Sequence, residues 1–235
     1  MLPKLAVPTF EMKLPSTGER ILYRPFLVKE EKVLLFAKQS GERVDIINAI
    51  KQVITSCVLN DDFDIDKITV FDMEYLFIKA RSVSVGNEIS FTVRDSTDET
   101  TYEFKLNLDE VEVTFPEDAN KQILLTDDIG IMMKYPTMEL SEKIADIDDV
   151  LDIASETVKH CIDYVFDKET TYPWSQEPEE DKDEFLNHLD QSQYEKITDF
   201  FTRVPKIEHI FEYTNGKGED KKVYFRKIED FFLLG

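Results

Sequence analysis

The chain has few of the residues on which most catalytic and cofactor-binding motifs depend. Its 235 residues include seven glycines, three histidines and two cysteines. The glycines are scattered, so no glycine-rich loop is present that could cradle a phosphate with backbone amides. No two histidines have the i, i+4 spacing of a zinc-protease helix, and two cysteines are too few for a disulfide scaffold or a cysteine-rich zinc site. The sequence therefore predicts no cofactor and no metal.

Positive charge and long apolar runs are also scarce. There are 28 Lys and Arg residues against 49 Asp and Glu residues, which gives a formal net charge of −21. Such a surface repels DNA and anionic membranes, and no apolar run approaches the length that crosses a bilayer. We therefore expect neither nucleic acid nor a membrane as a partner. The amino terminus has no basic stretch followed by an apolar one, so we expect residence in a cytosol, with Cys57 and Cys161 as small core residues.

The acidic residues are thickest at 146–152 and 177–184. Blocks of like charge are typical of solvated faces or exposed loops, and the alternative is an acidic face that meets a basic partner. Because acids are so abundant, pairs of carboxylates say nothing specific about glycosidase chemistry.

Two local patterns need comparison with known kinds of site. Asp62, Asp64 and Asp66 alternate as in a calcium loop, but lysine follows where the sharp turn needs glycine, so Asp64 or Asp66 is expected to cap the next helix instead. His160 adjoins Cys161, but adjacent helical residues point about 100° apart, so the pair does not form a nucleophile and its base.

Hydrophobic periodicity and turn residues predict an α+β fold. The amino-terminal half should contain a hairpin at 9–14 and 20–26, then helices at 29–39, 43–58 and around 71–80, then strands at 88–94, 101–108, 111–115, 122–126 and 129–134. In the first helix, residues 33–35 and Ala37 form the apolar pattern, and Gly41 is the stop.

The other half should begin with a long helix at 147–166, followed by shorter helices at 182–189 and 192–203. Asn215-Gly216 then gives the strongest hairpin signal, between strands at 206–214 and 221–226. Helical blocks would each be followed by a small antiparallel sheet or hairpin. We predict two domains: residues 1–136, with the first hairpin, three helices and a small sheet, and residues 137–235, with a helical block, the last hairpin and an apolar tail.

The apolar tail is the one candidate for a partner-binding site. Four consecutive apolar residues are hard to bury on one amphipathic face, so part of the tail is expected to dock in a partner subunit. These residues are Phe231, Phe232, Leu233 and Leu234.

Residues 23–32 read Tyr-Arg-Pro-Phe-Leu-Val-Lys-Glu-Glu-Lys, an extended approach that turns directly into a charged helix. With residues 50–58 and 71–81, and more loosely 82–86 and 107–112, this run resembles the baseplate hub proteins of T-even-like contractile-tailed bacteriophages. Some relatives carry cysteines at their hairpin tips. Here the tips at 95–99 and 215–218 contain none, so no zinc role carries over.

The resemblance implies a non-enzymatic baseplate hub subunit or hub-assembly factor that contacts other hub and tail proteins. It would act in the host cytoplasm during assembly, or reside in the tail baseplate of the virion. Two alternatives are a tail-associated cell-wall hydrolase and an acidic mimic of nucleic acid, and neither explains residues 23–32. The sequence leaves open whether the protein is a structural subunit or a transient assembly chaperone, as well as its stoichiometry and oligomeric state.

Overall fold

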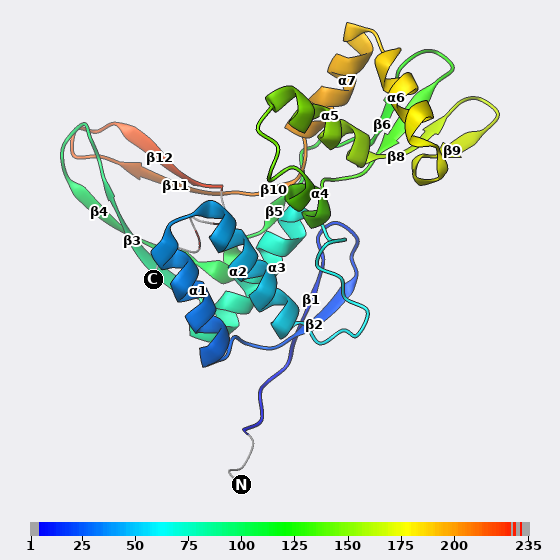
Figure 1. Cartoon of the computed structure of the whole chain (residues 1–235). Coiled ribbons are helices and arrows are strands. Elements are labelled where there is room, and N and C mark those ends of the chain that lie inside the picture. The colour runs from blue at the N-terminus through cyan, green and yellow to red at the C-terminus, as the bar shows by residue number, and fades with distance from the viewer. Residues whose placement is uncertain (1–4, 227, 229–230, 232–235) are drawn as a thin grey trace. The chain divides into compact units, whose positions relative to one another are not determined.

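The computed structural model describes residues 5–226, 228 and 231 (Figure 1). It confirms the α+β class, with seven α-helices and several small antiparallel sheets in the part of the chain described. The chain divides into two compact units: unit 1 comprises Met1–Thr114 and Lys206–Gly235, and unit 2 comprises Phe115–Pro205. This division differs from the predicted boundary between residues 136 and 137, because the last hairpin belongs with the first part of the chain.

Unit 1 begins with a hairpin and three helices, close to the predicted positions. They are β1 (Phe10–Lys13), β2 (Arg20–Tyr23), α1 (Val28–Ser40), α2 (Arg43–Cys57) and α3 (Val70–Val85). Gly41 ends α1 with a φ of 72°, a left-handed conformation that glycine adopts without strain.

The cap of α3 is not one of the predicted aspartates. Thr69 Oγ1 accepts a hydrogen bond from the Asp72 backbone N–H at 3.2 Å, and the Asp72 side chain reaches back to Thr69. Asp64 accepts from the Asp66 N–H in a turn, and Asp66 pairs with Lys51 at 2.7 Å. The predicted cap was therefore wrong because the helix begins later, at a threonine that forms a capping box with the residue three positions on.

The remaining strands of unit 1 form two hairpins and a short ladder. They are β3 (Glu88–Arg94), β4 (Thr101–Asn107), β5 (Val113–Thr114), β10 (Lys206–Ile207), β11 (His209–Thr214) and β12 (Asp220–Phe225), with a 3-10 turn η1 (Leu108–Glu110). β3 pairs with β4 and β11 with β12. The rings of Phe91 and Phe211 lie 4.9 Å apart and those of Phe91 and Phe225 4.7 Å apart, so one hairpin packs on the other through aromatic side chains.

The tips of these two hairpins are held together by hydrogen bonds. Asp95 accepts from the Tyr213 hydroxyl at 3.0 Å and from the Asn215 amide at 3.3 Å. Asp98 accepts from the Gly216 N–H at 2.8 Å. The backbone N–H of Thr97 is the main cause that lowers the pKa of Asp95 to about 2, so its carboxylate is charged at neutral pH.

Unit 2 contains a four-stranded antiparallel sheet and four helices. The sheet has the order β6 (Gln122–Leu124), β7 (Gly130–Met133), β8 (Ile162–Phe166), β9 (Thr171–Pro173). The helices are α4 (Met138–Lys143), α5 (Val150–Cys161), α6 (Glu179–Asn187) and α7 (Gln191–Thr202), with a 3-10 turn η2 (Trp174–Gln176).

The predicted long helix at 147–166 is confirmed for residues 150–161 and wrong for its last five residues, 162–166. Helix α5 ends at Cys161, and the chain continues directly as strand β8, which pairs with β7 on one side and β9 on the other. Ile162, Tyr164, Val165 and Phe166 favour strand by composition, and they gain two ladder partners that a helix would not provide. Helix α4 and strand β9 were not predicted.

Candidate functional site

The characteristic run at 23–32 connects β2, α1 and α2 through a nearly buried ion pair. Arg24 Nη2 lies 3.0 Å from Glu30 Oε1, and the two side chains are only 14% and 5% exposed. Arg24 also donates to the Ser56 carbonyl at 2.7 Å, while Glu30 accepts from the Leu27 N–H at 2.8 Å. The arginine therefore joins the end of α2 to the first turn of α1.

The charge state of Glu30 follows from these contacts. Burial alone would raise its pKa, but the hydrogen bonds from Arg24 and the Leu27 N–H outweigh burial and hold the pKa below its ordinary value of 4.5. Glu30 is thus ionised at neutral pH, and the run orients α1 on the other helices of unit 1.

Helix α1 carries apolar residues on both of its faces. Leu34 and Ala37 are buried, whereas Leu35 is 52% exposed and Phe36 69% exposed. Val28, two turns before Leu35 and on the same face, is 68% exposed.

A shallow hollow of about 150 Å³ lies beside this outer face, between α1 and α3. Phe26 and Phe77 line it, with ring centroids 5.8 Å apart. Leu35 lines it from α1, and Val85, which is 64% exposed, lines it at the end of α3. We call Val28, Leu35, Phe36 and Val85 the α1 surface. Grouped apolar exposure beside a hollow is typical of a surface that contacts another protein.

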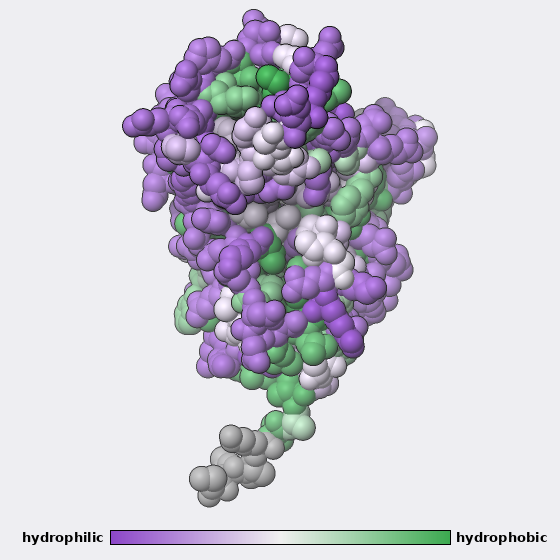
Figure 2. Space-filling model, turned by 90° about the vertical axis from the view of Figure 1, so that its right-hand side faces the viewer, coloured by the Kyte–Doolittle hydropathy of each residue, from purple (hydrophilic) through white to green (hydrophobic). Residues whose placement is uncertain are grey.

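The α1 surface is one of several exposed apolar areas among the described residues, since Val44 is 58% exposed and Leu151 78%. Figure 2 shows one face of the molecule, where hydrophilic residues predominate and hydrophobic ones appear in smaller patches. This agrees with the net charge of −21. Leu35 and Phe36 are nevertheless exposed in this strongly acidic protein. Burial of their apolar area against a partner would stabilise a complex.

Sequence reasoning did not find the α1 surface. It placed Leu34 and Leu35 in one apolar pattern, but adjacent helical residues point about 100° apart, so only Leu34 faces inwards. The spacing of seven residues between Val28 and Leu35 was the available signal, because it places both on the face opposite Ala37.

The predicted partner-binding tail lies mostly outside the described residues. Phe232, Leu233 and Leu234 are not described. Phe231 is 1% exposed, its ring lies 6.0 Å from that of Phe225, and its carbonyl accepts from Arg81 Nε at 3.3 Å. The Phe231 side chain is thus part of the core of unit 1 rather than of its surface.

The histidine and the two cysteines that the sequence analysis considered are buried or partly buried. His160 Nε2 lies 2.9 Å from the Thr137 hydroxyl, and burial lowers the pKa of this histidine. Burial raises the pKa of Cys161 to about 12 and that of Cys57 to about 11, so both thiols are protonated at neutral pH. Within the described residues there is no group of three or more His, Cys, Asp or Glu side chains that could hold a metal ion.

A comparison with protein families matches residues 7–233 to the family described as T4 bacteriophage base plate protein. The chain belongs to this family. Searches of curated proteins and of solved structures each found no match. The family match covers nearly the whole chain, including both units.

A base plate protein of a T4-like phage is a structural component of the tail, and its partners are other baseplate proteins. An exposed apolar helix face is suited to contact with another protein, and the family implies partners of this kind. Among the described residues, no helix combines the length and the apolar character that a bilayer-spanning segment needs.

Proposed function

We propose that this base plate protein is a non-enzymatic hub subunit or hub-assembly factor, and that the α1 surface is its main contact with other baseplate proteins. The observation that supports the proposal is the two-sided apolar character of α1. Leu34 and Ala37 are buried on the inner face of the helix, whereas Leu35 and Phe36 are more than half exposed. Two large apolar side chains at more than half exposure are a cost to solubility unless a partner covers them.

The buried ion pair supports the same proposal. Arg24 and Glu30 fix the first turn of α1 against the end of α2, so the outer face of the helix is presented in one orientation. A preorganised surface loses less conformational entropy on binding than a mobile one. The run that resembles hub proteins would thus act by holding the contact helix rather than by touching the partner itself.

The two alternative functions have less support from the described residues. A hydrolase needs a general acid whose pKa is raised, whereas the carboxyl groups with a shifted pKa in the described part of the chain, such as Glu30 and Asp95, are all shifted downwards. An acidic mimic would not need an apolar contact surface.

The contact is tested by replacing Leu35 and Phe36 together with glutamine, which keeps helix propensity and adds no charge. Tagged protein is recovered from infected cells, and the baseplate proteins bound to it are quantified by mass spectrometry. We expect recovery of those proteins to fall at least about tenfold, because an apolar contact of two large side chains is lost. The melting temperature should fall by only a few degrees, since both side chains are more than half exposed.

The matched control replaces Val150 and Leu151 with glutamine. These two adjacent apolar residues at the start of α5 are also exposed, at 75% and 78%. The control should recover baseplate proteins as the wild type does. Equal recovery by the α1 variant and the wild type would contradict the proposed contact. The two roles are separated by mass spectrometry of purified virions, since a subunit is present there in stoichiometric amount and a transient factor is not.

A further inference from the structure

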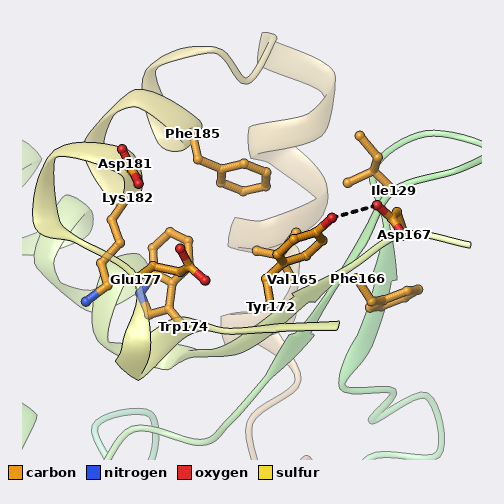
Figure 3. A pocket seen from close by; sticks show the side chains of 10 residues that line it. All are labelled: Ile129, Val165, Phe166, Asp167, Tyr172, Trp174, Glu177, Asp181, Lys182 and Phe185. Carbon is orange, nitrogen blue, oxygen red and sulfur yellow. Dashed lines mark hydrogen bonds between the residues drawn. The ribbon is translucent and has the colours of Figure 1, made fainter. Parts of the chain in front are cut away.

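Unit 2 contains an open pocket between one end of its sheet and helix α6 (Figure 3). Its volume is about 300 Å³. The apolar part of its lining comes from Ile129, Val165, Phe166, Tyr172, Trp174 and Phe185. Trp174 is the only tryptophan of the chain and is 6% exposed. Its indole N–H donates to the Lys159 carbonyl at 2.8 Å, and its ring stands edge-on to that of Phe185 at 5.9 Å. The Trp174 ring is therefore held in one orientation in the wall of the pocket.

Three carboxylates and one lysine complete the lining. Asp167 accepts hydrogen bonds from the backbone N–H groups of residues 169 and 170 and from the Tyr172 hydroxyl at 3.1 Å. These bonds lower the pKa of Asp167, so it is ionised at neutral pH. Glu177 and Asp181 also line the pocket, and their side chains accept no hydrogen bond and form no ion pair within the described part of the chain.

The one cation in the lining already has partners. Lys182 Nζ lies 2.8 Å from Glu179 and 5.9 Å from the centroid of the Trp174 ring. Figure 3 shows Lys182 on the other side of the indole from Tyr172, with the Glu177 carboxylate on the Tyr172 side. Lys182 is thus paired with Glu179, which also pairs with Lys159, and no cation of the described residues forms an ion pair with the carboxylate of Glu177 or Asp181.

We propose that this pocket binds an arginine side chain presented by a partner protein. A guanidinium is flat, stacks on aromatic faces and takes two hydrogen bonds from its fork to one carboxylate. The pocket offers both kinds of partner in its lining: the rings of Trp174 and Tyr172, and the carboxylate of Glu177, which has no ion pair with any described residue. A chain with a net charge of −21 also attracts basic partners during encounter. The inference concerns unit 2 alone and holds for a hub subunit and for an assembly factor equally.

Lysine is the less suitable occupant. An ammonium is strongly hydrated and has no planar face, so it gains less from contact with the aromatic rings of the lining. The pocket therefore predicts selectivity between two side chains of the same charge, which general attraction to an acidic protein does not.

The test uses the intact chain, because its single tryptophan reports directly on the pocket. Trp174 fluorescence is followed while three blocked tripeptides are added separately up to tens of millimolar, with Gly-Arg-Gly, Gly-Lys-Gly and Gly-citrulline-Gly as their sequences. We expect a saturable change with the arginine peptide and a dissociation constant on the order of 1–10 mM, as suits one side chain. The lysine peptide should bind at least about threefold more weakly, and the uncharged citrulline peptide should give no saturable change.

Glu177→Gln should weaken binding of the arginine peptide at least about fivefold, because a charge-assisted hydrogen bond is lost. Glu180→Gln is the matched control, since Glu180 is exposed in the first turn of α6, does not line the pocket and carries the same charge. It should change the affinity less than about twofold. Both variants should melt as the wild type does.

The proposal is overturned by an absence of saturable change with the arginine peptide, or by equal binding of the lysine or citrulline peptide. Equal weakening by Glu177→Gln and Glu180→Gln would also overturn it, since attraction to the acidic surface as a whole would then explain the binding. None of these outcomes bears on the α1 surface, which is tested separately.

Discussion

The sharpest test of the fold is the substitution Glu30→Gln, which removes the charge of the Arg24 and Glu30 pair and keeps the shape of the side chain. The two groups lie 3.0 Å apart and are nearly buried. Two unit charges at this distance attract by about 5.5 kcal/mol at an effective dielectric constant of about 20. Part of this attraction offsets the cost of removing both charges from water, so the net worth of the pair is smaller.

Removing one partner destabilises the protein by more than the net contribution of the pair to its stability, because the other charge stays buried. Such losses are typically about 3–5 kcal/mol. In this case Arg24 keeps its hydrogen bonds to the carbonyls of Pro25 and Ser56, and a glutamine at position 30 still accepts from the Leu27 N–H. We therefore expect Glu30→Gln to reduce the free energy of unfolding of unit 1 by about 2–4 kcal/mol at pH 7.

The assay is urea denaturation followed by far-ultraviolet circular dichroism, with Trp174 emission recorded in parallel to identify the transition of unit 2. The pKa of Glu30 is lower in the folded chain than its ordinary value of 4.5. Its contribution to stability is therefore complete above a pH of about 4.5 and is lost as the pH falls through the lower folded pKa. The difference between wild type and Glu30→Gln should shrink over that acidic range.

Glu31→Gln is the control, because Glu31 is exposed and follows Glu30 directly in α1. This substitution removes one negative charge, as Glu30→Gln does. It should alter the free energy of unfolding by less than about 0.5 kcal/mol. A loss below about 0.5 kcal/mol for Glu30→Gln, or a difference that does not depend on pH, would refute the view that the ion pair orients α1.

Two further substitutions test other parts of the fold by the same denaturation assay. Phe91→Ala should reduce the free energy of unfolding by about 3–5 kcal/mol, because Phe91 contacts aromatic rings of both hairpins and its removal leaves a cavity. The control is Phe115→Ala, at a residue that is 46% exposed, and it should reduce this free energy much less. Equal losses in the two variants would contradict the packing of the hairpins. Gly130→Ala should cost about 1–3 kcal/mol and change the emission of Trp174, because the added Cβ would lie 2.4 Å from Cζ of Phe166, which lines the same pocket. Unchanged stability and emission would show that the Phe166 ring moves aside freely.

The elements of unit 1 were predictable because their signals are local. Gly41 has the conformation that a helix stop requires, and Asn215-Gly216 lies between two paired strands as the turn residues indicate. Such features depend on a few adjacent residues, which the sequence shows directly.

The error at 147–166 has a different origin. The apolar spacing of α5 continues through Ile162 and Val165, so periodicity alone predicts one long helix. The change to strand β8 depends on pairing with residues 130–133 and 171–173, which no local pattern reveals. The formation of unit 1 from two separate segments was not predictable for the same reason. It depends on the contacts of Phe91 with Phe211 and Phe225, which are more than a hundred residues away in the sequence.

The candidate site was predicted only in part. The run at 23–32 was visible in the sequence, but the ion pair of Arg24 with Glu30 and the hydrogen bond of Arg24 to the Ser56 carbonyl at the end of α2 are visible only in the structure. The exposed position of Phe36 depends on which face of α1 meets α2, a property of packing rather than of periodicity. The aromatic and acidic lining around Trp174 is assembled from separate segments, none of which forms a motif by itself.

The pairing of β5 with β10 has a consequence for the order of events during synthesis. Lys206 lies opposite Thr114, so the chain leaves unit 1 and returns to it at neighbouring residues, after the whole of unit 2 has been made. A ribosome therefore releases every strand of the unit 2 sheet while unit 1 still lacks the hairpin that covers Phe91 and Phe104. Unit 2 can fold on the growing chain, whereas unit 1 has to wait for its last thirty residues. The part of the protein that begins first in the sequence is thus the part that is completed last.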